Sequence, residues 1–346
     1  MRLAVPTFPT VWVKASLPKP TPICSVLWEF ASKRQAIYMA RAAAAPPPWT
    51  TDPILKQYRF TNAFRAADRV SQVLIRMVYS DERASADTLL LRTLLFKIFN
   101  RIPTWEALVH RGGLPCADAF EPARCAETLA ALRARGVPIY SAAYIMPSGG
   151  AGLPKHEMHL SLIGQMLRDH LPERVQETKN LQQVYELLLG YPSLGPFLAF
   201  QYTIDLAYTS LVSHPESEFV VPGPGALDGL SKCFMSLGGY SPAATIMWLT
   251  EIQDQEFARH SLSFDALWGR RLQPIDIQNL LCEVSKYTRV SHPEVAGLSG
   301  RTRVKQSYTP GGDIEAPFFP PKWGINETVS KWIAQHRAKM PPRTLI

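Results

Sequence analysis

Two aspartates and two glycine-rich turns are the residues of this 346-residue chain whose types and spacing best suit chemistry. Asp205 lies ten residues after Gly195, on a segment with helical spacing. Asp228 follows Pro222-Gly-Pro-Gly225, whose prolines reduce the conformational entropy lost when the carboxylate is held in place. A fixed carboxylate can stabilise developing positive charge or activate water. We therefore predict Asp228, and after it Asp205, as the catalytic residues.

Each aspartate also has a purely structural interpretation. Asp228 stands near the start of an expected helix, where a carboxylate stabilises exposed backbone N–H groups. Asp205 would equally suit a buried position from which it caps a neighbouring loop. Both interpretations predict the same helices, so the sequence leaves the choice open.

The residues around Gly195 predict two helices joined by a tight hairpin. Residues 187–189 end one helix, 190–195 turn the chain, and Pro196 suits the first turn of the next helix. Such a turn directs several N–H groups to one spot beside a helix N-terminus, which suits a DNA phosphate. The predicted DNA contacts, from the two turns and from nearby cations, are Gly195, Gly223, Gly225, Lys232, Arg69 and Lys97.

Further polar and aromatic side chains suit a pocket for a base. Amides can bond to the edge of a base, and aromatic rings can stack on its face. Internal ion pairs and an aromatic core explain the same residues without a ligand, and both interpretations stay open. The predicted pocket residues are Asn62, Arg65, Tyr144, Phe197, Gln201, Gln278 and Asn279.

The elements that must position these residues are predicted to be helices almost throughout, so the fold class is mainly α. Apolar residues recur with a 3.6-residue period in 61–79, where Asn62 is the expected N-cap. Only residues 137–146 favour a strand. Thirty prolines explain why many elements are short.

Basic residues concentrate at the two ends of a chain whose formal net charge is +8. Residues 1–48 hold six Lys and Arg against one Glu, and residues 301–346 hold eight against three acids. Such ends suit a polyanion, although solvated tails have the same composition. We expect a disordered basic extension at 1–24, a helical domain at 25–325 and a basic C-terminal helix or tail at 326–346.

Cysteine usage and hydropathy predict the compartment. The five cysteines form no CxxC pair, which favours a reducing compartment without a structural metal. No apolar run approaches the ~20 residues that span a bilayer. We predict a cytoplasmic, nucleoid-associated protein with no metal, no cofactor, no membrane contact and no tight protein partner.

A set of strings within residues 25–325 resembles a known family. The strings are Asp52-Pro-Ile-Leu55, Tyr58-Arg-Phe-Thr-Asn62, Leu95-Phe-Lys-Ile-Phe-Asn100, Tyr140-Ser-Ala-Ala-Tyr-Ile-Met146, Leu194-Gly-Pro-Phe-Leu-Ala-Phe-Gln201, Phe219 to Gly229 and Ile275-Asp-Ile-Gln-Asn279. As a set they resemble the α-glutamyl/putrescinyl thymine pyrophosphorylase family, also described as the helical domain of hydroxymethyldeoxyuridine DNA kinases.

The resemblance implies a distant branch of the helix-hairpin-helix DNA glycosylases, with a multi-helix fold. It also implies a double-stranded DNA partner that carries modified bases. The chain departs from an ordinary glycosylase at Ser193, which replaces the first hairpin glycine, and at Phe197, which replaces the Schiff-base lysine. No GxxxxGK[ST] segment occurs, which disfavours phosphorylation by this chain.

From these features we predict a monofunctional DNA glycosylase, a hydrolase of N-glycosyl bonds. It would flip and excise a hypermodified 5-substituted pyrimidine, such as a hydroxymethylpyrimidine, in defence against phages with modified DNA. The alternative is a pyrophosphorylase or transferase that substitutes the 5-hydroxymethyl position and leaves the glycosidic bond intact. A third hypothesis is a protein that binds modified DNA without catalysis.

Overall fold

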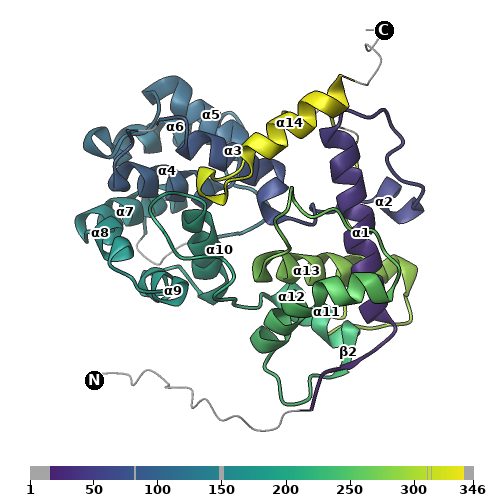
Figure 1. The fold of residues 1–346 in the computed structure, drawn as a ribbon. Helices are drawn as coiled ribbons and strands as arrows, with labels where there is room; N and C mark the ends of the chain where they lie inside the picture. Colours follow the sequence, from purple (N-terminus) through teal and green to yellow (C-terminus); the bar gives the residue numbers. More distant parts are fainter. Residues whose placement is uncertain (1–15, 82, 148–151, 310, 313, 339–346) are drawn as a thin grey trace.

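In a computed structural model the chain is mainly helical, as the sequence predicts (Figure 1). The structure describes residues 16–81, 83–147, 152–309, 311–312 and 314–338. The α-helices are α1 (Ile23–Ala42), α2 (Pro53–Gln57), α3 (Arg69–Val78), α4 (Ala86–Phe99), α5 (Ile102–Gly112), α6 (Pro122–Ala134), α7 (Lys155–Arg168), α8 (Leu171–Gln176), α9 (Leu181–Leu189), α10 (Pro196–Ala207), α11 (Pro224–Cys233), α12 (Pro242–Arg259), α13 (Pro274–Ser291) and α14 (Asn326–Arg337). Short 3-10 helices are η1 (Arg65–Ala67), η2 (Ala117–Ala119) and η3 (Pro321–Trp323), and strand β1 (Lys19–Pro20) pairs antiparallel with β2 (Phe234–Ser236).

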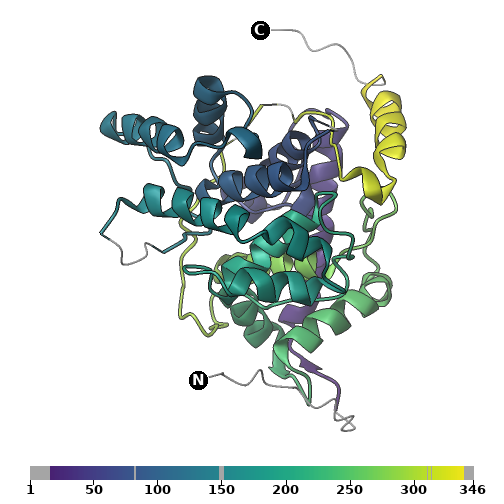
Figure 2. The same ribbon diagram turned by 90° about the vertical axis from the view of Figure 1, so that its left-hand side faces the viewer.

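The helices gather into two groups that share one continuous apolar core. In Figure 1, α3 to α10 lie on one side, whereas α1, α2 and α11 to α13 lie on the other. Helix α14 crosses above the junction in that view, and the turned view of Figure 2 shows it on the outside of the molecule. The candidate site described below lies where the two groups meet.

Helix α4 is central to the first group because it is buried on all sides. Each residue from Thr88 to Phe99 is buried, which is the pattern of a helix inside a core rather than on a surface. Its first turn is capped by Ser85, whose Oγ accepts a hydrogen bond from the Thr88 N–H at 3.2 Å. It ends at Asn100, which adopts a left-handed conformation with φ of 48°.

The predicted hairpin joins α9 to α10. Its turn is closed by the Leu194 N–H, which donates to the Tyr191 carbonyl at 3.3 Å. The positive φ of 65° that the turn requires falls on Ser193, while Gly195 is the extended N-cap of α10. The hairpin thus forms without glycine at its strained position. Its kinship with the hairpin of DNA glycosylases stays a prediction.

Helices α11 and α13 pack closely because α11 presents glycines to its neighbour. A Cβ atom on Gly229 would overlap the carbonyl of Leu281, and one on Gly225 would overlap the Cys282 sulfur. Only glycine permits this approach of two helix backbones. The Pro/Gly loop before Asp228 is therefore needed for packing as well as for rigidity.

The helix predicted over 61–79 is wrong in its first half. Residues 61–64 form no helix, η1 follows, and α3 begins only at Arg69. The half-buried Asp68 carboxylate accepts a hydrogen bond from the Asn62 N–H at 2.9 Å, a local bond that competes with helix formation. Asn62 is consequently no N-cap, and Asn62, Arg65 and Arg69 do not share a helix face. The strand predicted over 137–146 is also wrong, since that segment is irregular where it is described.

The two ends of the chain are described in part. Residues 19–20 form β1 and residues 23–24 begin α1, so this part of the expected extension at 1–24 is structured. Helix α14 occupies 326–337, whereas residues 1–15 and 339–346 lie outside the described residues. The predicted division into domains stays a prediction. In the part of the chain that is described, no helix combines the length and apolar character needed to cross a bilayer.

Candidate functional site

Arg65 lies at the centre of the junction between the two helix groups. Its side chain is 3% exposed, and its Nη1 lies 2.9 Å from Oδ1 of Asp205 on α10. Its Nε and Nη2 donate to the side chain and the carbonyl of Gln201, both at 3.3 Å. Its backbone N–H donates to Oδ1 of Asp276 on α13 at 2.7 Å. One residue of η1 therefore connects α10 with α13.

Lys97 of α4 is the second buried cation at this site. Its Nζ lies 3.5 Å from Oδ2 of Asp205 and donates to Oδ1 of Asn100 at 2.9 Å. Burial lowers the pKa of Lys97 to about 8, while the Asp205 carboxylate limits the fall. Burial also lowers the pKa of Arg65, but Asp205, Tyr208 and Tyr144 together outweigh it and hold that pKa well above its usual value. Two cations thus face one carboxylate.

Some buried polar atoms at this site lack hydrogen-bond partners among the described residues. They are Nε2 of Gln201 and the hydroxyl of Tyr202. An unsatisfied buried polar group costs free energy, so it commonly marks a place where water or a ligand binds. The Arg65–Asp205–Lys97 cluster, with Gln201, is therefore the candidate site.

Two aromatic rings border this cluster. Tyr144 and Phe197 stack with their ring centroids 5.8 Å apart and their planes at 8°. Nζ of Lys97 lies 5.1 Å from the centre of the Tyr144 ring, and burial raises the pKa of Tyr144 to about 12. Phe197 in turn lies against Gly223, where an added Cβ would come within 2.7 Å of its ring. The hairpin turn, the Pro/Gly loop and the charged cluster are thus neighbours.

Asp228 is placed differently from Asp205. Its carboxylate accepts hydrogen bonds from the Ser285 hydroxyl and, at 2.7 Å, from the Ser299 N–H. Burial raises the pKa of Asp228, but these bonds outweigh it and hold the pKa below its usual value. Its partners are protein groups of α13 and the loop after it, which fits the structural interpretation.

Two lysines predicted to contact DNA have buried side chains. Lys97 belongs to the cluster above, and Nζ of Lys232 donates to the Ser285 carbonyl and the Thr288 hydroxyl, both at 3.1 Å. A direct bond from either ammonium group to a DNA phosphate would require it to leave these partners. The two lysines were predicted to contact DNA because the sequence does not reveal the buried oxygen atoms to which each ammonium group bonds.

The remaining predicted site residues differ in burial and in their hydrogen-bond partners. Asn62 accepts from Arg34 at 2.8 Å and donates to the Ala67 carbonyl, so both ends of its amide have protein partners. Gln278 is buried with its Oε1 unpartnered in the described structure, whereas Asn279 is half-buried. Arg69 and Gly195 are exposed. Within the described ranges no group of three His, Cys, Asp or Glu residues could hold a metal ion.

Two residues of the site were not predicted from the sequence. Asp276 is buried, accepts hydrogen bonds from the backbone N–H groups of Arg65 and Gln273, and has a pKa that burial raises to about 6. Tyr208, whose ring lies 5.5 Å from the Arg65 guanidinium carbon, was not considered. The spacing of Gln201, Asp205 and Tyr208 follows one helix face, which is the signal that could have found it.

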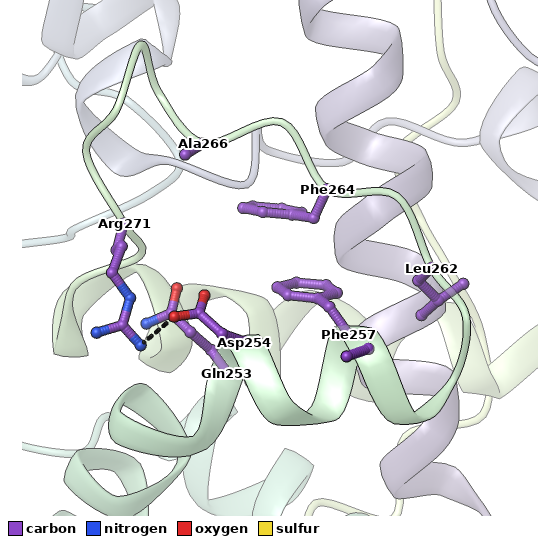
Figure 3. Close-up of a pocket in the computed structure, with 8 residues that line it drawn as sticks. Gln253, Asp254, Phe257, Leu262, Phe264, Ala266 and Arg271 are labelled. Carbon is purple, nitrogen blue, oxygen red and sulfur yellow. Dashed lines mark ion pairs between the residues drawn. The ribbon is translucent and has the colours of Figure 1, made fainter.

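A separate pocket of about 280 Å³ lies between α12 and the following loop (Figure 3). Its walls include Phe257 and Phe264, which stack at 4.3 Å, and Arg271, which pairs with Asp254 at 2.9 Å. The Gln253 amide at its base bonds on both sides to the backbone of Leu272. Because its polar groups are already paired, this pocket offers less for recognition than the buried cluster.

In a comparison with known proteins, the chain matches a family of DNA-modifying proteins. Residues 21–297 match the family described as 5-hmdU DNA kinase, helical domain, and the chain belongs to this family. A curated relative, the 5-hmdU DNA kinase of Bacillus phage SP10, is 28% identical over 277 residues, covering 74% of this chain and 43% of that protein. The chain thus spans under half the length of this relative. No solved structure matches the chain.

These matches confirm the family that the sequence resembles and overturn the predicted activity. The relative is named a DNA kinase, which is a transferase, so the prediction of a monofunctional glycosylase that hydrolyses N-glycosyl bonds is wrong. The prediction relied on the glycosylase-like hairpin. A hairpin that binds a phosphate specifies how DNA is held, not which bond is broken. The alternative prediction, transfer at the 5-position, fits the matches better.

Proposed function

We propose that this chain takes part in modification of 5-hydroxymethylpyrimidines in DNA. It would act as a helical unit that binds the DNA, holds the base and supports transfer chemistry at its 5-position. The N-glycosidic bond stays intact in this proposal. The observation that carries it is the family match over residues 21–297, which includes every residue of the buried cluster.

The charge of the cluster supports an anionic group on the substrate. At neutral pH Lys97 is largely protonated, since its pKa is about 8, and Arg65 carries a permanent charge. Asp205 balances one of these charges, and the unpartnered Nε2 of Gln201 adds a hydrogen-bond donor. A phosphoryl or pyrophosphoryl group at the 5-position would meet cations and a donor here.

The Tyr144–Phe197 stack supports a place for the base. A flipped pyrimidine stacks on aromatic rings and is read by hydrogen bonds to its edge. In this proposal the base displaces Tyr144 from Phe197 and brings its 5-substituent towards Lys97, over which the Tyr144 ring lies. Substitution would then break the bond from the 5-methylene carbon to oxygen, releasing pyrophosphate with the bonding electron pair. The amine forms a bond to that carbon and gives up a proton.

Phosphorylation of the 5-hydroxymethyl group is the second candidate, because it is the activity in the name of the relative. A phosphoryl transfer from ATP needs a nucleotide site, commonly a GxxxxGK[ST] loop. This sequence contains no such segment. The sequence therefore supports phosphorylation by this chain less than it supports a role in holding the modified base.

The test uses duplex oligonucleotides that carry 5-hydroxymethyl-, 5-phosphomethyl- or 5-pyrophosphomethyluracil, with and without ATP and an amine. Nucleosides from digested product are identified by mass spectrometry. An unbroken strand with a changed 5-substituent is the expected result, and gain of phosphate only with ATP would select phosphorylation. Release of free base with alkali-labile sites, or no change on any substrate, would overturn the proposal.

A matched pair of variants tests the site. Lys97→Met removes the ammonium group beside Asp205, and we expect turnover to fall at least ~100-fold, since electrostatic groups at a reacting centre have effects of this size. Lys322→Met is the control. Burial also lowers the pKa of Lys322 to about 8, but its Nζ donates to the carbonyls of Thr209 and Val212 outside the cluster. Equal loss in both variants would point to stability rather than chemistry.

A further inference from the structure

Residues 295–301 form a surface loop after α13 that is held from below by Asp228. The Ser299 N–H donates to Asp228 Oδ1 at 2.7 Å, and the Leu298 N–H donates to the Ser231 hydroxyl at 3.4 Å. Within the loop the Gly300 N–H donates to the Gly297 carbonyl at 3.2 Å. A buried carboxylate and a helix surface thus fix the backbone on both sides of Leu298.

The loop lies in direct contact with α11. A Cβ atom added to Gly297 would overlap the Asp228 carboxylate and would come within 2.9 Å of Lys232 Cε. Such an approach leaves no room for a side chain at this position. The loop is therefore packed against the protein rather than free to collapse over its own apolar residue.

Leu298 points away from this packed surface and is 76% exposed. A single exposed leucine is common on soluble proteins and normally needs no explanation. Here, however, the backbone N–H groups of Leu298 and Ser299 are both bonded to α11, so the loop holds this exposed side chain at a defined place. The loop presents one apolar side chain at a fixed position.

Cations follow this leucine closely in the sequence. Arg301, Arg303 and Lys305 are exposed, and Arg289 on α13 donates to the Arg303 carbonyl at 3.3 Å. None of these four forms an ion pair with a carboxylate among the residues that the structure describes. Residues 292–305 of the sequence contain a single acidic residue, Glu294. Cations without paired acids beside an exposed leucine suit duplex DNA, which has phosphates outside and stacked bases inside.

The loop also has a defined relation to the candidate site. Gly223, at the start of α11, lies against Phe197, and Asp228 follows five residues later on the same helix. At ~1.5 Å per residue, these positions are about 7.5 Å apart along the axis. The helix whose Asp228 holds the loop therefore begins beside the aromatic stack of the candidate site.

We propose that Leu298 is an apolar wedge that enters between base steps of duplex DNA bound at this face, with Arg301 and Arg303 on the flanking phosphates. Proteins that kink or open a duplex insert leucine, isoleucine or methionine in this way. The wedge rests on the proposed function, since it supplies the local unstacking that brings a base to the Tyr144–Phe197 stack. Asp228 then serves as the anchor of the wedge loop.

The test measures unstacking and binding separately. A duplex carries 2-aminopurine next to 5-hydroxymethyluracil, so fluorescence reports unstacking, and anisotropy at several salt concentrations reports affinity. For Leu298→Ala we expect the fluorescence rise to fall at least ~5-fold while the salt dependence stays unchanged. Leu298→Met should keep the rise, and Arg303→Gln should lower the slope of log K against log salt by about one.

Leu114→Ala is the matched control, because Leu114 is also exposed but follows α5 in the other helix group. It should leave fluorescence and affinity unchanged. A full fluorescence rise in Leu298→Ala with normal binding would overturn the wedge and leave the proposed function standing. If the unaltered protein binds none of these duplexes, the proposed function fails and the wedge fails with it.

Discussion

At the scale of single residues, the site depends on one carboxylate that serves two cations. Asp205 is fully buried and pairs with both Arg65 and Lys97. The sequence predicted Asp205 as the second choice for catalysis and Asp228 as the first. The structure distinguishes them by their partners, because Asp228 bonds to neutral protein groups while Asp205 faces charge.

Replacing Asp205 should therefore be costly. Asp205→Asn leaves two buried cations uncompensated, and we expect a loss of about 3–5 kcal/mol in the free energy of unfolding. Asp254→Asn is the control, since Asp254 pairs with Arg271 at the same 2.9 Å but on the surface. Its cost should stay within about 1 kcal/mol. Denaturant titration of both variants decides the matter, and equal costs would contradict the charge network.

The lowered pKa of Lys97 predicts a dependence of stability on pH. Its pKa is about 8 in the folded protein and near its ordinary 10.5 in the unfolded chain. Between these values the unfolded chain binds more protons, so the contribution of Lys97 to stability rises with pH, by at most about 1.4 kcal/mol per unit. Compared with Lys97→Met, the unaltered protein should gain stability from pH 8 to pH 10. A constant difference would place the ammonium group in water.

At the scale of elements, the hairpin between α9 and α10 carries a strained residue. Ser193 has a φ of 65°, a conformation that costs a non-glycine residue about 1 kcal/mol. Ser193→Gly should therefore stabilise the protein by up to about 1 kcal/mol. Ser213→Gly is the control, because exposed Ser213 has no positive φ. There the glycine relieves no strain, and it destabilises the protein slightly by adding conformational freedom to the unfolded chain. Stabilisation by both changes, or by neither, would argue against strain in the turn.

Elements with strong local signals could be predicted from the sequence. A helix over residues 86–99, the observed bounds of α4, could be predicted because the segment is strongly apolar and is followed by Asn100-Arg-Ile-Pro103. Residues 61–68 could not be predicted, since the bonds that shape them come from distant segments: Arg65 to Asp276, and Thr61 to Glu283 at 3.0 Å. Apolar periodicity continues through that stretch, but long-range polar contacts override it.

At the scale of the whole molecule, the site is a product of the meeting of two helix groups. Each residue of the Arg65–Asp205–Lys97 cluster was singled out from its type and spacing. The sequence offered no way to see that three separate segments place these side chains together, because that depends on packing across the junction. The activity could not be predicted from the sequence either, since the same hairpin and carboxylates suit both hydrolysis and group transfer.

The N-terminal strand has a consequence for biosynthesis. Thr21 bonds to the carbonyls of Lys232 and Cys233, partners about 211 residues later in the chain. On a ribosome that adds ~5–20 residues per second, they follow it by about 10–40 seconds. During that interval α1 exposes its apolar residues, which α11 and α13 later cover, and Trp28, which later packs against Phe257 of α12. The nascent chain is therefore expected to require a chaperone at α1 until α13 has emerged.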